Sequence, residues 1–187
     1  MMIVEPERTH EVSASIRSPA DTTRCWREIR RALGVYCETC VSGRHSRGRP
    51  AERETNDVDG SSCESLVVEL DHASSLMLLA AVEGAVRVDY QQRVRGWSRD
   101  RLSQAMRSLH RKKGARAKFE VDLLRLWRDE TPIKRKSVQD LIYAMRYRHW
   151  LAHGRCWSED LHRDYAFDDI DEIAVAFMEG MRTYADP

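Results

Sequence analysis

The sequence predicts an all-α fold, a bundle of about five helices preceded by a less ordered N-terminal extension. The segment from Leu76 to Val82 is apolar on every side, which is typical of the central helix of a bundle. Apolar residues recur at helical spacing in the segments that follow it. Between these segments lie helix-breaking residues, namely Gly114, Pro132 and Gly154. Together these observations favour several consecutive helices after a polar N-terminal part.

The N-terminal extension is predicted to span residues 1–62, and the compact helical domain residues 63–187. Within the extension, residues 21–34 form a short amphipathic helix, with Asp21 or Thr22 as the N-cap and Gly34 as the terminator. Residues 42–62 combine Gly and Pro with charged and polar side chains, which predicts a linker or disordered loop. We therefore place the start of the compact domain near Cys63.

The compact domain is divided by its caps and breakers into five helices. They are expected over residues 65–95, from the cap Ser98 to Lys113, over 115–129, from Ser137 to Gly154, and from near Asp168 onward. The run Leu66-Val67-Val68 also suits a short strand ahead of the first of these helices, although the helix is favoured. Helix 115–129 is expected to end at Thr131-Pro132.

The bulk composition narrows the class of protein. A chain of 187 residues with 42% hydrophobic and 33% charged residues fits one soluble domain with an appendage. We find no apolar run near the ~20 residues needed to cross a bilayer, and the N-terminus lacks the features of a secretory signal. We therefore expect a cytoplasmic protein with no membrane partner.

The cysteines predict neither disulfides nor a metal site. Five scattered cysteines make no disulfide framework. The pair Cys37-x-x-Cys40, with His45 after it, suggests zinc, but one such pair falls short of four ligands unless Cys25 folds back to it. We expect no metal and no cofactor.

Charge is separated along the chain despite a formal net charge of +1. Residues 87–118 carry eleven Arg or Lys against two Asp, and residues 158–187 carry nine Asp or Glu against two Arg. The basic block suits a polyanion, with Arg111, Lys112 and Lys113 as candidate RNA contacts. Two other interpretations remain open: a solvated helix face, or a basic helix docked on the acidic segment within or between subunits.

The helix predicted from Ser137 ends in an unusual cluster of an arginine and two histidines. Ser137 and Asp140 have the spacing of a capping box, and Gly154 is a natural stop. The expected buried stripe consists of Val138, Leu141, Ile142, Met145 and Ala152. At about 100° per residue, Arg148 lies on one edge of that stripe, His153 on the other, and His149 just inside it. A half-buried arginine requires a partner or a phosphate.

This cluster resembles the signature of the HEPN superfamily, an arginine, a polar residue, three spacers and a histidine. The matching residues are Arg148, His149, Trp150-Leu151-Ala152 and His153, followed by Gly154. The resemblance covers roughly residues 64–184. It implies a compact helical domain that dimerises and brings two motifs together as a metal-independent RNase centre.

The resemblance also assigns expected roles. His153 would transfer protons, because imidazole titrates near neutrality, unless it only complements the helix dipole. Arg148 would hold the scissile phosphate through its planar guanidinium, and His149 would orient the phosphate or share the proton transfer. An acidic residue on an earlier helix often accompanies the motif, which points to Glu83, with Asp89 as the alternative.

Other residues near the motif have weaker expected roles. Glu83 lies in the most apolar helix, where it could pair with Arg148, or with Arg87 on its own helix. Arg146 and Arg155 flank the motif and could extend a phosphate-binding surface. Trp150 and Trp157 suit base stacking or, more often, packing.

We therefore expect a HEPN-type endoribonuclease of a toxin–antitoxin or antiviral defence system, acting as a homodimer on RNA. An antitoxin or other regulatory protein could restrain it. The alternative is a non-catalytic HEPN-fold module that binds RNA, nucleotides or a protein partner. A third interpretation, a purely structural helical protein, predicts that Arg148 and His153 tolerate alanine.

Overall fold

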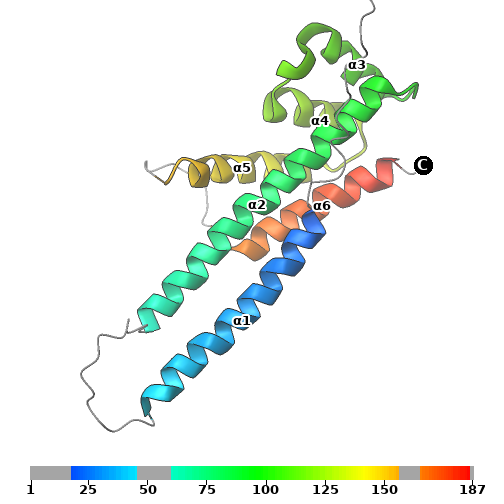
Figure 1. Ribbon diagram of the computed structural model, residues 1–187. Helices are drawn as coiled ribbons and strands as arrows, with labels where there is room; N and C mark the ends of the chain where they lie inside the picture. Colours follow the sequence, from blue (N-terminus) through cyan, green and yellow to red (C-terminus); the bar gives the residue numbers. More distant parts are fainter. Residues whose placement is uncertain (1–17, 46–59, 156–164, 186–187) are drawn as a thin grey trace, which may run out of the picture.

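A computed structural model describes residues 18–45, 60–155 and 165–185, and every element of secondary structure in these residues is a helix (Figure 1). This confirms the all-α fold class. The elements in chain order are α1 (Pro19–His45), α2 (Gly60–Arg95), α3 (Arg101–Lys113), a 3₁₀ turn η2 (Gly114–Arg116), a π-helix η3 (Phe119–Leu124), α4 (Arg125–Glu130), α5 (Arg135–Ala152) and α6 (Phe167–Ala185).

Helix α2 is the element on which the others assemble. Its 36 residues make a rod about 54 Å long at 1.5 Å per residue. The middle of the rod is buried, with Leu78, Leu79, Val82 and Val86 fully inaccessible to solvent. Helices α1, α3, α5 and α6 all pack against it. The prediction of a central helix around Leu76–Val82 is confirmed.

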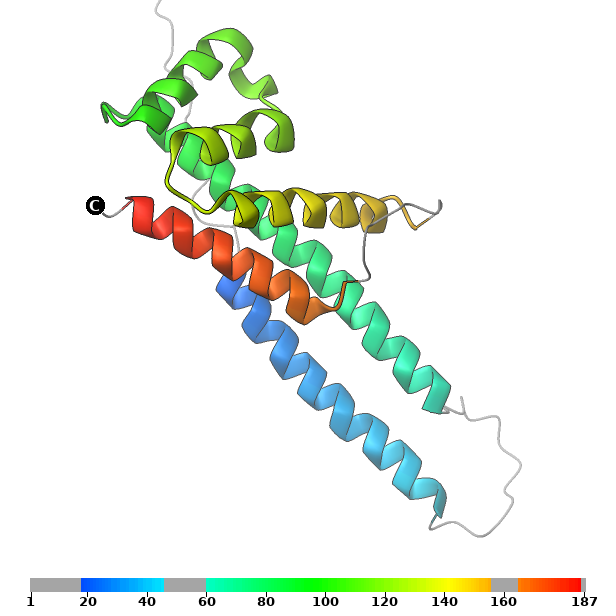
Figure 2. The ribbon, with the colours of Figure 1, turned by 180° about the vertical axis from the view of Figure 1, so that it is seen from behind.

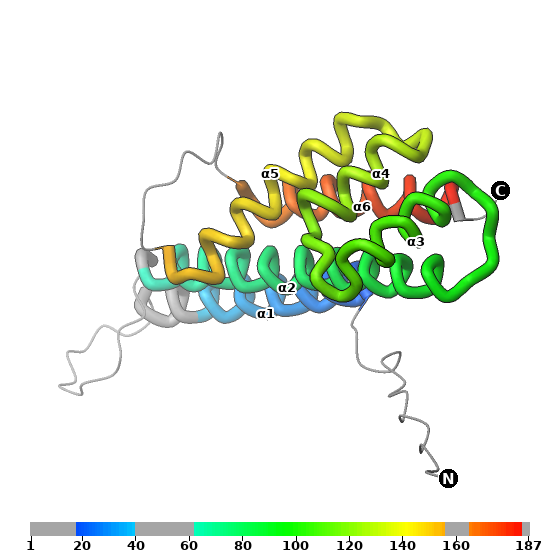
Figure 3. Tube along the Cα trace, turned by 90° about the horizontal axis from the view of Figure 1, so that it is seen from above, coloured from blue at the N-terminus to red at the C-terminus, as the bar shows by residue number. Residues whose placement is uncertain are grey.

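The helices form two layers (Figures 2 and 3). Helices α1 and α2 lie side by side, and α5 and α6 cover one side of this pair, while α3 and α4 gather at the C-terminal end of α2. The core between the layers contains the buried side chains of Trp127, Leu141, Phe167 and Phe177. The arrangement leaves the C-terminal end of α5 lying against α2, where it determines the surroundings of the motif.

Helix α1 is longer than the sequence predicted. It continues through Gly34 to His45, so the expected terminator at Gly34 is wrong. A glycine inside a helix costs only about 1 kcal/mol, and packing of α1 along α2 offsets that cost. The predicted linker is correspondingly shorter, and its residues 46–59 lie outside the described part of the chain.

The expected extension shares a core with the rest of the protein. The Trp26 ring of α1 stacks on Phe167 of α6 at 4.1 Å between centroids, and its Nε1 donates to Asp71 Oδ1 of α2 at 2.9 Å. Thr23 Oγ1 also donates to Asp171 Oδ1 at 2.6 Å. The division at Cys63 stays a prediction, but α1 belongs to the same packed body as α2 and α6.

The two predicted N-caps after α2 are wrong. Helix α3 begins at Arg101 with Asp100 as its cap, and Asp100 accepts from Ser103 N, whereas Ser98 Oγ donates to Asp100. Helix α5 begins at Arg135 without a side-chain cap, and Asp140 pairs with Lys136 Nζ at 2.6 Å instead of closing a capping box with Ser137. In both cases a side chain that was expected at the helix start is bound to another local partner, Ser98 to Asp100 and Asp140 to Lys136.

The predicted helix 115–129 is broken into η2, η3 and α4. Asp122 accepts from Lys118 N at 2.8 Å and from Lys113 Nζ at 2.7 Å, which fixes the chain at the start of the π-turn. The predicted end at Thr131-Pro132 and the start of the last helix near Asp168 are confirmed by α4 and α6. The run Leu66–Val68 lies within α2, so the optional strand is wrong.

By length and composition, the α2 segment Ser62–Arg95 could cross a membrane. The expectation that no apolar segment is long enough is therefore not confirmed. The core helix of a soluble protein passes the same test, and Leu78 and Val82 are buried against other helices. The cytoplasmic location stays a prediction.

Candidate functional site

The buried face of α5 differs from the predicted stripe and changes the position of the motif residues. The side chains buried on α5 are those of Val138, Leu141, Ala144, Met145 and Tyr147. Ala144 and Tyr147 were not in the predicted stripe. At about 100° per residue they turn the buried face so that Arg148 lies near its centre and both histidines lie outside it. The predicted placement of His149 inside the stripe, and of Arg148 and His153 on its edges, is wrong.

Arg148 points from α5 towards α2 and meets Glu83. Its Nη2 lies 3.4 Å from Glu83 Oε2, and its side chain is 32% exposed. Its Nε is buried and makes no hydrogen bond within the described part of the chain. The expected Arg148–Glu83 pair is therefore present, with one donor of the guanidinium unused.

Glu83 is shared between two arginines. Arg87 Nε donates to Glu83 Oε1 at 2.8 Å, so the i,i+4 pair on α2 exists together with the pair to Arg148. Arg87 also lies over the Phe119 ring, 5.9 Å from its centroid. Asp89, the alternative acidic partner, pairs with Arg93 instead. Two cations around one carboxylate leave a local excess of positive charge, which favours an anion.

The two histidines lie on the solvent-facing side of α5. His149 and His153 are exposed, and their ring centroids are 4.2 Å apart, as expected for positions i and i+4. His153 is the C-cap of α5, and its backbone N–H donates to His149 O at 3.1 Å. On the same side, the exposed Arg146 guanidinium lies over the Tyr143 ring at 5.5 Å.

Arg148 and the histidines do not face one point in a single chain. His149 follows Arg148 by about 100° around the helix, and His153 follows it by about 140°. The arginine faces α2 and Glu83, whereas the histidines face solvent. The described geometry of one chain thus separates a phosphate-binding group from two proton-transfer groups.

The turn after α5 is fastened to α2 by Arg155. Gly154 and Arg155 have φ values of 73° and 56°, which reverse the chain at the helix end. Arg155 Nη1 lies 2.8 Å from both Glu69 Oε1 and His72 Nδ1, and Nη2 lies 3.2 Å from Glu69 Oε2. Hydrogen bonding to Arg155 lowers the pKa of Glu69. Arg155 is thus already paired, and its contact with RNA stays a prediction.

Trp150 packs within the protein. Its ring is stacked near the Tyr147 ring at 5.9 Å and meets His72 edge-on at 6.4 Å. This agrees with the packing interpretation for Trp150. Trp157 lies outside the described residues.

The basic block has paired and unpaired members. Lys113 Nζ lies 2.7 Å from Asp122 Oδ1, which partly neutralises it, whereas Arg111 and Lys112 are exposed at the end of α3. Among the described residues, no ion pair joins this block to the acidic segment 158–187. The block does contact that segment at Tyr184, whose ring lies under Arg93 and whose hydroxyl donates to Asp100 Oδ1 at 3.1 Å, and docking between subunits stays a prediction.

The structure does not test the prediction that the protein binds no metal. Within the described ranges, no cluster of three or more His, Cys, Asp or Glu side chains could hold a metal ion. Cys25 and Cys37 of α1 are free and partly buried. The side chains of Cys40 and His45 are outside the described part.

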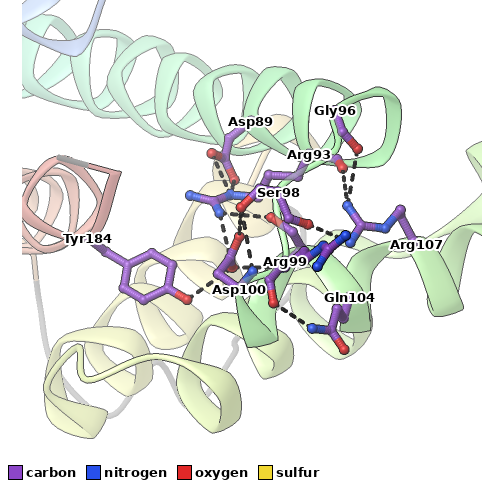
Figure 4. A network of polar contacts seen from close by, with 10 residues as sticks. Asp89, Arg93, Gly96, Ser98, Arg99, Asp100, Gln104, Arg107 and Tyr184 are labelled. Carbon is purple, nitrogen blue, oxygen red and sulfur yellow. Dashed lines mark hydrogen bonds and ion pairs between the residues drawn. The ribbon is translucent and has the colours of Figure 1, made fainter. Parts of the chain in front are cut away.

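A second arginine that is largely buried, and which the sequence analysis did not single out, lies near the C-terminal end of α2 (Figure 4). Arg93 Nε donates to both carboxylate oxygens of Asp89 at 2.9 Å, and Nη1 contacts Ser103 Oγ at 3.1 Å and Asp100 Oδ1 at 3.4 Å. Its guanidinium lies 5.4 Å from the Trp127 ring centroid and 5.3 Å from that of Tyr184. This arginine fastens α2, α3, α4 and α6 together.

The two carboxyl groups around Arg93 titrate differently. Burial raises the pKa of Asp89, and the Arg93 charge only partly opposes it. Burial also acts to raise the pKa of Asp100, but hydrogen bonds from Ser103, Ser98 and Tyr184 outweigh it and hold that pKa well below its usual range. Asp100 is therefore the carboxylate that the surrounding structure stabilises in its charged form.

No protein-family model matches the chain, and neither a curated protein nor a solved structure is significantly similar to it. The HEPN resemblance therefore depends on the residues of α5 and their surroundings alone.

Proposed function

We propose that the protein is a HEPN-type, metal-independent endoribonuclease that acts on RNA as a homodimer, in a toxin–antitoxin or phage-defence setting. The observation that carries the proposal is the half-buried Arg148 guanidinium, which shares one carboxylate with Arg87 and keeps a buried donor unused. A phosphate could approach the exposed part of this side chain, which is 32% accessible, and would supply acceptors beyond the shared Glu83 carboxylate. The proposed partners are RNA, a second copy of the chain and, for a toxin, a restraining antitoxin protein.

The chemistry follows from the residue types. One imidazole, assigned to His153, takes the proton of a ribose 2′-hydroxyl, and the 2′-oxygen attacks phosphorus. The bond from phosphorus to the 5′-oxygen breaks, and that oxygen takes a proton from a second imidazole, assigned to His149. Arg148 stabilises the negative charge on the non-bridging oxygens, and Glu83 holds the guanidinium in place. The products are a 2′,3′-cyclic phosphate and a 5′-hydroxyl.

A dimer supports this chemistry better than one chain does. Because Arg148 and His153 face different sides of α5, a phosphate in contact with both groups is more readily reached from two chains. The exposed side of α5 with Arg146, His149 and His153 is the surface that a second copy would complete.

The same separation favours a second candidate, a HEPN-fold module that binds RNA, a nucleotide or a protein partner without cleavage. In that case Arg148 would bind a phosphate and the histidines would serve only the helix end. The two candidates differ in one observable, the appearance of new RNA ends.

The experiment is incubation of the full chain with end-labelled RNA in EDTA, followed by analysis of the product ends. We expect wild type to produce cyclic-phosphate ends and His153→Ala to lose at least about 100-fold in rate, since proton transfer by a positioned side chain contributes at least that much. His110→Ala, which removes an exposed histidine of α3, is the matched control and should cleave like wild type. Intact RNA with wild type would exclude the nuclease and leave the binding module.

A further inference from the structure

Trp97 lies almost entirely in solvent. Its side chain is 96% exposed, in the loop between α2 and α3 that spans residues 96–100. Tryptophan is on average strongly buried, because its large apolar ring gains free energy from leaving water. No other large apolar side chain of this loop or of α3 is among the exposed ones in the described part of the chain. Trp97 is thus a single aromatic ring in polar surroundings.

The loop that carries Trp97 has a fixed backbone (Figure 4). The Arg107 guanidinium of α3 donates to three backbone carbonyls in and next to this loop, those of Arg93, Gly96 and Ser98, at 3.2, 3.2 and 2.6 Å. Ser98 Oγ donates to Asp100, which also caps α3. The loop backbone is therefore fixed while the Trp97 ring is exposed to solvent. Less conformational entropy is lost when a partner binds to a loop that is already ordered.

The charges around Trp97 are positive. Arg95 and Arg99 are exposed two residues to either side of it and make no ion pair among the described residues. Arg101 is 87% exposed at its side chain, with Glu130 at 3.8 Å. The acidic residue of the loop, Asp100, is already engaged with Arg93. An aromatic ring between free guanidinium groups suits a ligand that carries both flat π-systems and negative charge.

We propose that Trp97, Arg95 and Arg99 form a binding site for single-stranded nucleic acid. A base stacks on the indole ring, and the two arginines contact the flanking phosphates. A protein partner would more often meet a cluster of apolar residues around such a ring, and this loop has none. A groove of about 650 Å³, walled in part by Ser98, Asp100, Lys134 and Tyr184, opens beside the loop and gives adjacent nucleotides room.

This site is separate from the motif on α5. Trp97 follows Glu83 by fourteen positions, most of them within α2, which is roughly 20 Å at 1.5 Å per residue. An extended RNA strand can reach both sites, so the Trp97 site would hold a substrate of the proposed nuclease away from the scissile bond. Binding at Trp97 does not depend on cleavage, and the experiment separates the two.

The experiment measures fluorescence anisotropy of a labelled, mixed-sequence 2′-O-methyl oligoribonucleotide, which cannot be cleaved because its 2′-oxygen is blocked. We expect Trp97→Ala to weaken binding by at least about fivefold, since stacking on an aromatic side chain contributes that much per base. Trp97→Phe keeps a π-face and should keep most of the affinity. Arg95→Ala/Arg99→Ala should lower the slope of log affinity against log salt by about 1.4. Arg31→Ala, an exposed arginine of α1, is the matched control and should bind like wild type.

Two results would overturn this proposal. Equal affinities of wild type and Trp97→Ala would exclude the ring as a nucleic-acid contact, and so would failure of wild type to bind the oligonucleotide. Trp97→Ala that alters sedimentation but not oligonucleotide affinity would assign the ring to contact with another protein chain. Cleavage activity decides none of these outcomes, so the Trp97 site and the nuclease can fail independently.

Discussion

Arg93 and Arg148 both contact acidic residues of α2, and their surroundings differ. Arg93 has a side chain that is 13% exposed, with two carboxylates, a hydroxyl and two aromatic rings around it. Arg148 is 32% exposed, shares its one carboxylate with Arg87, and has a buried Nε without a partner in the described part of the chain. The first guanidinium is satisfied by the protein, and the second is not.

This difference separates a structural role from a ligand-binding role. A buried charge with a complete set of partners fixes the elements that supply them, and its loss leaves those partners uncompensated. A charge with an incomplete set costs folding free energy that a bound anion would return. We infer that Arg93 serves the fold and that Arg148 serves a ligand.

The largest expected effect comes from Arg93→Met, which keeps most of the side-chain volume and removes the charge. Asp89 would remain mostly buried without its cation, at 18% side-chain exposure, and Asp100 would lose a partner. We expect a loss of about 3–5 kcal/mol in the free energy of unfolding. Urea unfolding followed by circular dichroism measures it.

The double variant Arg93→Met/Asp89→Asn is the control for that interpretation. Because burial already raises the pKa of Asp89, removing its charge together with the arginine should recover part of the lost stability. A double variant no more stable than Arg93→Met would show that the loss comes from packing of the arginine between Trp127 and Tyr184, and not from the stranded carboxylate.

A smaller, pH-dependent effect is expected from Asp100→Asn. The pKa of Asp100 is held below its usual value of about 3.9, so its charged form stabilises the folded state at neutral pH. That stabilisation is complete above the unfolded pKa and is lost as pH falls towards the lower folded pKa. We expect Asp100→Asn to lose about 1–2 kcal/mol at pH 7, and the difference from wild type to shrink below about pH 4.

Unfolding in urea at pH 7 and at pH 3 tests whether the stability difference between wild type and Asp100→Asn shrinks at low pH. Asp140→Asn is the matched control, since Asp140 pairs with Lys136 at the surface and should change stability by less than about 1 kcal/mol. A deficit of Asp100→Asn that stays constant or grows towards pH 3 would contradict the role given to the Asp100 charge.

Much of the fold was predictable because helix periodicity and breakers are local signals. The central position of α2, the end of α4 at Thr131-Pro132 and the start of α6 follow from apolar runs and proline. The capping box at Ser137 was wrong because Asp140 pairs with Lys136, and the length of α1 was wrong because packing on α2 overrides Gly34. Such helix boundaries depend on side-chain pairs and on packing between helices, which the pattern of a single sequence segment does not reveal.

The candidate site was predictable in part. The meeting of Arg148 with Glu83 followed from a charge in an apolar helix that requires a partner. The rotation of α5 could not be predicted, because alanine and tyrosine occur both in protein cores and on surfaces. Packing against the neighbouring helices determines that Ala144 and Tyr147 are buried. Trp97 was missed because exposure of a loop aromatic has no periodic signal, although the three arginines around it were visible.

The smallest expected effect on stability completes the comparison of the two arginines. Arg148→Met is the same substitution as at Arg93, but Glu83 would keep Arg87 at 2.8 Å, and the unused Nε would disappear. We expect a change below about 1 kcal/mol in the free energy of unfolding, together with loss of RNA cleavage under the EDTA conditions above. Arg135→Ala, an exposed arginine at the start of the same helix, controls for the loss of one positive charge there. If Arg148→Met is as unstable as Arg93→Met, Arg148 has the structural role as well, and its unused donor no longer supports a ligand.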